Sequence, residues 1–368
     1  QHAETAARLM GGLVPAELLT ASRPAAERRA ARARLASGAA RLVIGTHALL
    51  QGQVGFADLG LLVVDEQHRF GVEQRDALVR RTERSGRAPH VLHMTATPIP
   101  RTLALTVYGD LDVTTIAGAP AGRQRVVTRL VDEGQREAGY EFVRGQIAKG
   151  RQVYVVCPAI DESDSISAAT ALAEAERLQA GPFHEARVAV VHGQLKAAAR
   201  EAVMRAFKAG TVEVLVATSL IEVGIDVANA TVMIVEGAER FGLAQLHQLR
   251  GRVGRGAEKS YCLLFSQAET GSARARLQAL LETTDGFELA DRDLEIRGEG
   301  QVMGARQAGV PELKLARLAH DRAALLRARE LAQGILAADP RLEGPQSTPL
   351  RAAVEAAFGR ELAWLLKA

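Results

Sequence analysis

The chain has 368 residues, of which 46 are Lys or Arg and 43 are Asp or Glu, so its formal net charge at pH 7 is +3. With 47% hydrophobic and 24% charged residues it has the composition of a folded globular protein, which excludes a disordered or collagen-like chain. No segment approaches the roughly 18 uninterrupted apolar residues of a membrane span, and the first residues lack the layout of a signal peptide. We therefore expect a soluble intracellular protein without a membrane partner.

Short apolar runs rich in β-branched residues recur along the chain, and helical patterns separate them. Runs of this kind are typical of parallel strands that are buried on both faces of a sheet. The predicted strands are residues 41–46, 61–66, 90–97, 152–158, 187–193, 213–219, 231–237 and 260–266. Ala-, Leu- and Glu-rich patterns predict helices over 165–180 and 195–210. The alternation of strands and helices predicts an α/β fold with parallel sheets.

Two changes of pattern divide the chain into regions. The stretch 115–122 is rich in Gly, Ala and Pro and lies between two groups of predicted strands, so we place a domain boundary there. The β pattern stops near Glu269, and the remainder is predicted to be helical. The predicted regions are a first domain over 1–117, a second domain over 118–268 and a helical region over 269–368.

The two cysteines, Cys157 and Cys262, each lie inside an apolar run. This position favours reduced, packed thiols over a disulfide or a metal site.

The string LLVVDEQHRFG, residues 61–71, carries the first candidate site. Its four apolar residues would deliver Asp65 and Glu66 to the carboxyl end of a parallel strand, where open α/β sheets bind their ligands. Adjacent carboxylates there suit a nucleotide with Mg2+, because one can hold the hydrated metal while the next orients the attacking water. Charged residues also end many strands simply by reaching solvent, so the pair alone leaves both interpretations open.

Two further strings continue the pattern. The string MTATPIPRTLAL, residues 94–105, leaves a strand through Thr95 and Thr97 and enters a helix after its prolines. It is either an ordinary loop or a hydroxyl-bearing linker that senses a neighbouring nucleotide. The string QLHQLRGRVGRG, residues 245–256, leads a short helix into a glycine-spaced loop with three arginines, Arg250, Arg252 and Arg255. Their guanidinium groups suit phosphoryl oxygens, and a solvated basic turn is the alternative.

The order and spelling of these strings resemble the superfamily 2 nucleic-acid motors. DEQH stands as motif II, TAT as motif III, residues 216–230 as motif V and QLRGRVGR as motif VI. More narrowly, GTHALLQ, DEQHRFG, TATPIPRTLAL and AERFGLAQLHQLRGRVGRG are similar to the RecG family of bacterial branched-DNA translocases. The resemblance implies two RecA-like parallel-sheet motor domains, the first incomplete, followed by a mostly helical translocation region.

The resemblance also implies an activity and its partners. An ATP-dependent helicase and translocase of DNA repair and recombination is expected, with ATP and Mg2+ as cofactors. Its partner is branched double-stranded DNA, meaning forks and Holliday junctions, with single-strand-binding protein as a further candidate. A monomer in the bacterial cytoplasm, associated with the nucleoid, is the expected form.

Site residues are carried over by position in the motifs. The catalytic residues implied are Asp65, Glu66, His68, Arg252 and Arg255, with Asp65 also the metal ligand. The nucleotide-binding residues implied are Asp65, Gln248, Gly224 and Asp226. The DNA-binding residues implied are Thr46, Thr218 and His192. The coupling residues implied are Thr95, Thr97, Arg276, Arg297 and Gln307.

The coupling residues at the C-terminal side belong to a string, residues 285–309, that is similar to the family's translocation motif of a helical hairpin and loop. It departs from that motif at Glu299 and Gln301, where the family usually has Pro and Glu.

The chain has no GxxxxGK[ST] string, the loop whose backbone amides and lysine bind ATP phosphates. The resemblance places that loop upstream of Gln1, so we interpret the chain as a fragment that is inactive alone. Such a fragment would expose apolar surface on its first sheet. An ATP-independent DNA-binding module is the alternative of another class. The rival within the enzyme class is the translocase module of the transcription-repair coupling factor, where DEEHRFG is usual, and Gln67 favours RecG.

Overall fold

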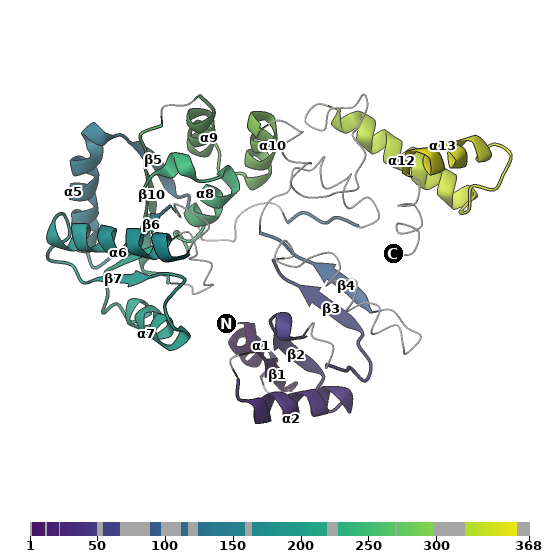
Figure 1. Cartoon of the computed structure of the whole chain (residues 1–368), viewed down its shortest axis with the longest axis horizontal. Helices are drawn as coiled ribbons and strands as arrows, with labels where there is room; N and C mark the ends of the chain where they lie inside the picture. Colours follow the sequence, from purple (N-terminus) through teal and green to yellow (C-terminus); the bar gives the residue numbers. More distant parts are fainter. Residues whose placement is uncertain are drawn as a thin grey trace. The chain divides into compact units, whose positions relative to one another are not determined.

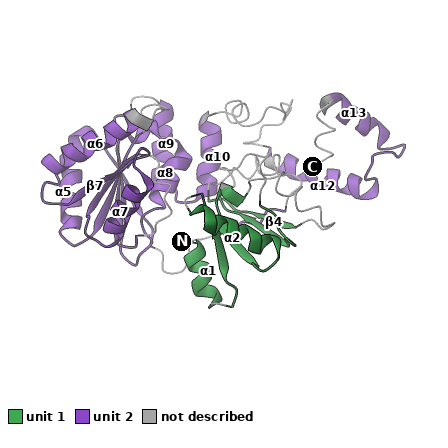
Figure 2. Ribbon diagram, turned by 60° about the horizontal axis from the view of Figure 1, so that its bottom comes forward, with its two compact units in different colours: residues 1–96, 368 green, residues 97–367 purple. Residues whose placement is uncertain are grey.

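The computed structural model describes residues 2–11, 13–21, 23–49, 54–66, 89–96, 112–116, 124–158, 164–218, 227–268, 271–297 and 321–358 (Figure 1). The chain divides into two compact units, Gln1–Ala96 and Thr97–Lys367, which Figure 2 colours separately. Within the described ranges, none of the helices has the length and apolarity that crossing a membrane would need.

Unit 1 contains two pairs of parallel strands, β1 with β2 and β3 with β4. Its described elements are α1 (His2–Met10), β1 (Ala16–Leu19), α2 (Ala25–Ala36), β2 (Leu42–Gly45), η1 (His47–Leu49), β3 (Leu61–Val64) and β4 (His90–His93). A small core of Leu19, Ala31, Leu35 and Val54 packs α2 against β1. Gly38 follows the end of α2 with a φ of 77°, the left-handed conformation that commonly ends a helix.

The prediction that every strand is buried on both faces is wrong for β3 and β4. Leu61 is 59% exposed, Val63 48% and Leu92 50%. The described sheet that contains them has only two strands, and a strand pair has too few neighbours to cover both of its faces. The expected exposure of apolar surface on the first sheet is therefore confirmed.

The described part of unit 2 is built on a parallel sheet of six strands in the order β5–β10–β9–β6–β8–β7. These are β5 (Val127–Val131), β6 (Gln152–Cys157), β7 (Val188–Val191), β8 (Val214–Thr218), β9 (Ala230–Val235) and β10 (Tyr261–Phe265). Every residue of β6, β8 and β9 is buried, which confirms the prediction of doubly covered strands at the centre of the sheet.

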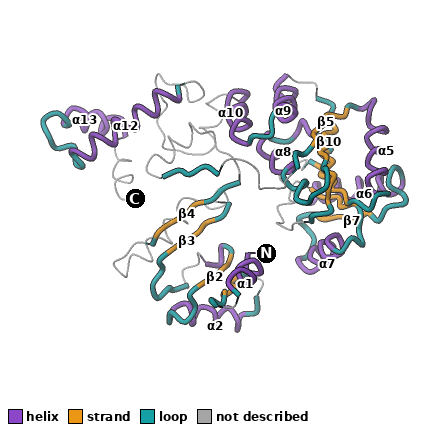
Figure 3. The backbone as a smooth tube through the Cα atoms, turned by 180° about the vertical axis from the view of Figure 1, so that it is seen from behind, coloured by secondary structure: helices purple, strands orange, loops and turns teal. Residues whose placement is uncertain are grey.

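Helices cover both faces of this sheet (Figure 3). Successive residues of a strand point to opposite faces, so Val153 and Val155 join one apolar cluster while Tyr154 and Val156 join the other. The first cluster includes residues from α5 (Arg136–Ile147) and α6 (Asp164–Ala180). The second includes residues from α7 (Ala197–Lys208), α8 (Leu243–Arg250), α9 (Gly271–Glu282) and α10 (Gly286–Arg297). Two short 3-10 turns, η4 (Glu133–Gln135) and η5 (Ala238–Arg240), follow β5 and β9.

The predicted helices over 165–180 and 195–210 are α6 and α7. After β10 the described elements are all helical, as predicted, and they end with α12 (Arg322–Ala338) and α13 (Thr348–Phe358). Two strands, β1 and β5, are not among those predicted from the sequence. β1 is only four residues long, and β5 interrupts its apolar residues with Thr128 and Arg129, because it lies at the edge of the sheet.

Candidate nucleotide and nucleic-acid sites

Asp65 and Glu66 directly follow the last residue of β3, which confirms that this strand delivers both carboxylates to its carboxyl end. Asp65 Oδ1 accepts a hydrogen bond from the Glu66 amide at 2.9 Å, and Asp65 Oδ2 lies 3.2 Å from His2 Nε2 of α1. Glu66 has a φ of 51°, a left-handed conformation that is uncommon for a residue with a side chain. Backbone outliers of this kind cluster at functional sites.

Thr95 lies at the same edge of the sheet as this acidic pair. β4 runs parallel to β3, Val64 is paired with His93, and the Met94 amide donates to the Val64 carbonyl at 2.8 Å. Thr95 is therefore two residues beyond the end of its strand, just as Glu66 is beyond the end of β3. The structure thus brings motif II and motif III together as expected, while His68 and Thr97 lie outside the described residues.

The acidic pair fits a magnesium nucleotide by the chemistry of its donors. Among the described residues there is no group of three or more His, Cys, Asp and Glu side chains that could hold a metal ion. Mg2+ is usually held by one or two carboxylates together with phosphate oxygens and water, so an all-protein cage is not required. The exposed Asp65 and the half-buried Glu66 would supply the carboxylates for that mode of binding.

Two of the predicted DNA-binding residues are neighbours at the carboxyl edge of the unit 2 sheet. Thr218 ends β8 and His192 follows β7, and the preceding residues, Ala217 and Val191, are paired. Thr218 Oγ1 and His192 Nδ1 are shielded from solvent and have no hydrogen-bond partner within the described ranges. Buried polar atoms are almost always paired, so this edge holds unused hydrogen-bonding capacity. Gly224 and Asp226 lie outside the described residues.

The third predicted DNA-binding residue, Thr46, lies in unit 1 directly after β2. It is exposed, and its carbonyl accepts a hydrogen bond from the Leu49 amide at 2.9 Å, which closes the η1 turn. The strand predicted over 41–46 included Thr46, and the observed strand ends one residue earlier.

The motif VI string forms α8 and the loop that follows it. Leu243, Leu246 and Leu249 are buried in the core, and Gln248 is half-buried. After the helix, Arg252 is half-buried and Arg255 is exposed. The arginines that were predicted to meet phosphate are therefore accessible on a loop whose base is fixed by a packed helix.

Glycine is required at two positions of this loop. Gly254 has a φ of 76°, and a Cβ there would lie 2.9 Å from Val126 Cγ2. A Cβ on Gly256 would lie 2.7 Å from the Ala228 carbonyl oxygen. The loop therefore packs closely against the residue before β5 and the turn before β9, as the glycine spacing of the sequence indicated.

Arg250 differs from the other two arginines of the string. It is only 3% exposed, and its Nη1 donates to the Leu280 carbonyl at 2.7 Å and the Thr283 carbonyl at 2.9 Å. Its Nη2 donates to His247 Nδ1 at 3.0 Å. Arg250 thus ties α8 to the C-terminal end of α9, a role that sequence reasoning missed. The helical spacing from Leu246 to Arg250 places both residues on the buried face and could have revealed it.

Helix α10 covers the first part of the string 285–309, which was predicted to form a hairpin and loop, and it packs against α9. Arg276 Nη2 donates to the Glu239 carbonyl at 3.0 Å, which fixes α9 to η5. Arg292 of α10 forms an ion pair with Glu282 at the end of α9. Arg297 is the last residue of α10, and nothing of its side chain is described, while Gln307 lies outside the described residues.

Three family models match the chain. The DEAD/DEAH box helicase model matches residues 1–106, and the helicase conserved C-terminal domain model matches residues 135–257. The model of ATP-dependent DNA helicase RecG, domain 3, C-terminal, matches residues 283–362. These ranges fall within the regions 1–117, 118–268 and 269–368, whose boundaries stay predictions. The order of two RecA-like motor domains and a helical C-terminal region is confirmed.

Curated relatives give the same family. The chain is 49% identical over 330 residues to the ATP-dependent DNA helicase RecG of Synechocystis sp., covering 90% of this chain and 39% of the relative. It is 46% identical over 346 residues to the protein of the same name from Streptococcus pneumoniae, covering 94% of this chain and 51% of the relative.

A solved structure agrees. The structure of RecG bound to a three-way DNA junction matches with a TM-score of 0.68 and 39% identity, over 88% of this chain and 41% of that one. The chain therefore spans about half or less of the length of the proteins that it matches. Motif order, fold and identity lead to one conclusion: the chain belongs to the RecG family of helicases.

Proposed function

We propose that this protein uses ATP hydrolysis to move along double-stranded DNA and to remodel branched DNA, such as stalled forks and Holliday junctions. Membership of the RecG family supports the proposal. The observation that carries it is the pair of bonds from Arg250 to α9, because they join the arginine loop of motif VI to the helical hairpin. A change at the arginine loop would therefore reach α9 through one packed side chain.

The proposed chemistry assigns a role to each residue of the nucleotide site. Asp65 would hold Mg2+, which supplies neutralisation of the charge that develops on the phosphates. Glu66 would orient the attacking water, and Gln248, Gly224 and Asp226 would contact the nucleotide. Arg252 and Arg255 would stabilise the γ-phosphate as its bond breaks. His68 is assigned to the same site by its place in motif II.

Coupling to movement would use the second set of residues. Thr95 and Thr97 follow the strand beside the acidic pair and would report the state of the nucleotide. Arg276 fixes α9 to η5, so the hairpin would move together with the sheet of unit 2. Arg297 and Gln307, at and after the end of α10, would transmit that movement to duplex DNA.

DNA itself would be held through its backbone. Thr46, Thr218 and His192 all lie at or just after strand ends, where hydroxyl, imidazole and amide groups can contact phosphates without reading bases. Binding should therefore depend on salt and not on sequence. The protein would act as a monomer in the bacterial cytoplasm, on the DNA of the nucleoid. Single-strand-binding protein would be a second partner.

The test is ATP hydrolysis by the full-length protein and by the 368-residue chain, each with and without a three-way DNA junction. We expect junction-stimulated hydrolysis by the full-length protein and none by the 368-residue chain, which has no GxxxxGK[ST] loop. Junction binding without any hydrolysis in the full-length protein would contradict the proposal and favour an ATP-independent DNA-binding module.

A further inference from the structure

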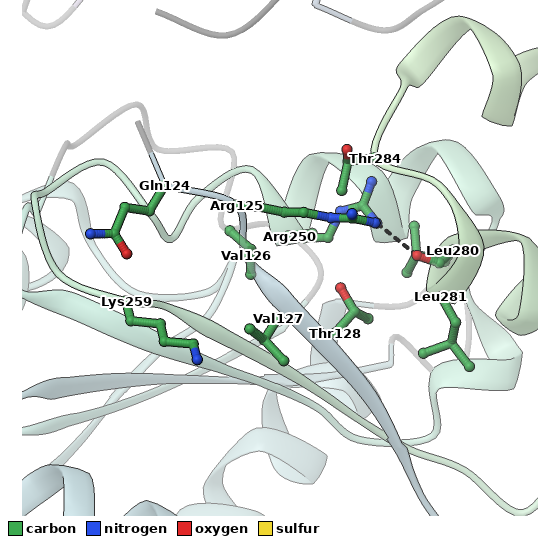
Figure 4. A pocket seen from close by; sticks show the side chains of 10 residues that line it. All are labelled: Gln124, Arg125, Val126, Val127, Thr128, Arg250, Lys259, Leu280, Leu281 and Thr284. Atoms are coloured by element: carbon green, nitrogen blue, oxygen red, sulfur yellow. Dashed lines mark hydrogen bonds between the residues drawn. The ribbon is translucent and has the colours of Figure 1, made fainter. Parts of the chain in front are cut away.

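Unit 2 contains a pocket of about 570 Å3 at the amino ends of β5 and β10 (Figure 4). The residues that line it are Gln124, Arg125, Val126, Val127, Thr128, Arg250, Lys259, Leu280, Leu281 and Thr284. They come from the start of β5, the residue that ends α8, the approach to β10 and the end of α9. Three of these described lining residues are cationic and none is acidic, and Arg252 and Arg255 are not among them.

Among the described residues, no acidic side chain lines the pocket or forms an ion pair with its cations. Arg250 is buried, and the partners of its Nη atoms are neutral carbonyls and an imidazole. Burial lowers the pKa of Arg250 and the charge of Arg125 lowers it further, while Cys262 opposes both. Figure 4 shows the guanidinium groups of Arg125 and Arg250 directed toward the same part of the pocket. Two cations that repel each other across a cavity favour the binding of an anion between them.

The acidic residues nearest in the sequence do not supply that anion. Glu258, next to Lys259, pairs with Arg151 at 2.8 Å. Glu282, next to Leu281, pairs with Arg292. Arg125 and Lys259 form no ion pair in the part of the chain that the structure describes, and Lys259 Nζ lies 5.9 Å from the centre of the Tyr261 ring. The positive charge of the pocket is therefore left for a ligand.

Hydroxyl groups add hydrogen-bonding capacity beside the cations. Thr128 Oγ1 is shielded from solvent and has no hydrogen-bond partner within the described ranges, and Thr284 also lines the pocket. A tetrahedral anion with several acceptor oxygens can use guanidinium forks, an ammonium group and hydroxyls together. Arg125 and Lys259 are exposed, so such an anion can enter from solvent.

We propose that the pocket formed by Arg125, Arg250 and Lys259 is a phosphate-binding site of the second motor domain, separate from the nucleotide site that the motifs assign. The phosphate can come from the DNA backbone or from a free phosphate compound, because the same groups would recognise both. The possibility that the phosphate belongs to DNA depends on the proposed function, whereas binding of a free phosphate compound does not.

The experiment compares the Arg125→Ala and Lys259→Ala variants with the unmutated 368-residue chain. Both residues are exposed, so these variants keep the buried contacts of the fold. Arg129→Ala is the matched control, since Arg129 is an exposed arginine of β5, close to Arg125 in the sequence, that does not line the pocket. Two properties are measured for each protein: affinity for a short DNA duplex at several salt concentrations, and the rise in melting temperature produced by pyrophosphate.

If the phosphate belongs to DNA, each pocket variant binds the duplex about three- to tenfold more weakly, and the slope of log affinity against log salt falls by about 1. If it belongs to a free compound, duplex binding is unchanged and the stabilisation by pyrophosphate is lost. The proposal is overturned if both variants keep both properties, or if Arg129→Ala loses as much as they do. Failure of the full chain to bind duplex would count against the proposed function alone, because the pyrophosphate measurement still tests the pocket.

Discussion

Glu66 combines a carboxylate at the end of β3 with a backbone φ of 51°. A left-handed residue with a side chain costs on the order of 1 kcal/mol, and the cost is tolerated where the side chain must point in one direction. Within the acidic pair, Glu66 has this left-handed backbone and Asp65 does not. This difference agrees with separate proposed roles in orienting water and in holding Mg2+.

We predict that Glu66→Gln in the full-length protein keeps ATP binding but lowers turnover by about 10^2- to 10^4-fold, because the amide cannot act on water as the carboxylate does. Steady-state hydrolysis and binding of a fluorescent ATP analogue measure the two properties. Asp58→Asn, at an exposed carboxylate of the same unit, serves as the control and should change neither. Normal turnover in Glu66→Gln would remove this residue from the catalytic assignment.

The buried cysteines predict how stability depends on alkaline pH. Burial raises the pKa of Cys262 from 9.0 to about 12, and burial also raises the pKa of Cys157. Above pH 9 the unfolded chain binds fewer protons than the folded chain, so the free energy of unfolding falls with pH between 9 and about 12. The slope is on the order of 1.4 kcal/mol per pH unit for each thiol.

Urea unfolding at about pH 8 and about pH 10.5 measures this dependence. Cys262→Ala should make it shallower, while a control change at an exposed site, Lys149→Ala, should leave it unaltered. An equal slope in all three proteins would show that the thiols do not control alkaline stability.

At the scale of elements, α8 and α9 are joined by the charged side chain of Arg250 as well as by apolar contacts. We predict that Arg250→Ala destabilises the chain by about 3 kcal/mol, since it leaves the Leu280 and Thr283 carbonyls without their charged donor. Arg129→Ala, at an exposed arginine of β5, should cost less than about 0.5 kcal/mol. Chemical denaturation of both variants checks the difference, and similar costs would mean that the link is weak.

The loop after α8 depends on Gly254 for space as well as for conformation. Gly254→Ala and Gly210→Ala both place a side chain at a φ of 76°. A Cβ on Gly254 would lie 2.9 Å from Val126 Cγ2, whereas a Cβ on Gly210 would have no described atom within 4 Å. We predict that Gly254→Ala is the more destabilising by about 1–3 kcal/mol, the usual cost of overpacking. Thermal unfolding compares the two. Equal losses would show that backbone strain alone sets the requirement for glycine.

For the whole molecule, the acidic pair belongs to unit 1, while the arginine loop and the hairpin belong to unit 2. The proposed function uses residues of both units for hydrolysis but assigns Arg297 to movement alone, so a change at Arg297 should separate the two activities. We predict that Arg297→Ala in the full-length protein keeps most junction-stimulated hydrolysis and loses fork movement. A fluorescent fork substrate measures movement beside hydrolysis. Arg292→Ala, in the same helix, controls for loss of helix packing, and equal loss of both activities in Arg297→Ala would refute a coupling role.

Local sequence patterns were sufficient to predict many of the strands and site positions of this protein. Apolar runs with β-branched residues identified β2, β3, β4 and most strands of unit 2. For the central strands of unit 2 the reason is that a strand covered on both faces needs apolar residues at every position. The same runs located Asp65, Glu66 and Thr95 at strand ends, and they located both cysteines in the core. Motif order then identified the family. All of these properties depend on residues that are close together in the chain.

Only the tertiary structure decided which distant residues are neighbours. The strand order β5–β10–β9–β6–β8–β7 places His192 beside Thr218, and no spacing in the sequence states that pairing. The packing of α8 on α9 buries Arg250, although the sequence groups it with the exposed Arg255. The cationic pocket likewise needs the starts of β5 and β10 to lie side by side. Sheet register and helix packing are non-local, so they depend on how the whole chain buries its apolar surface.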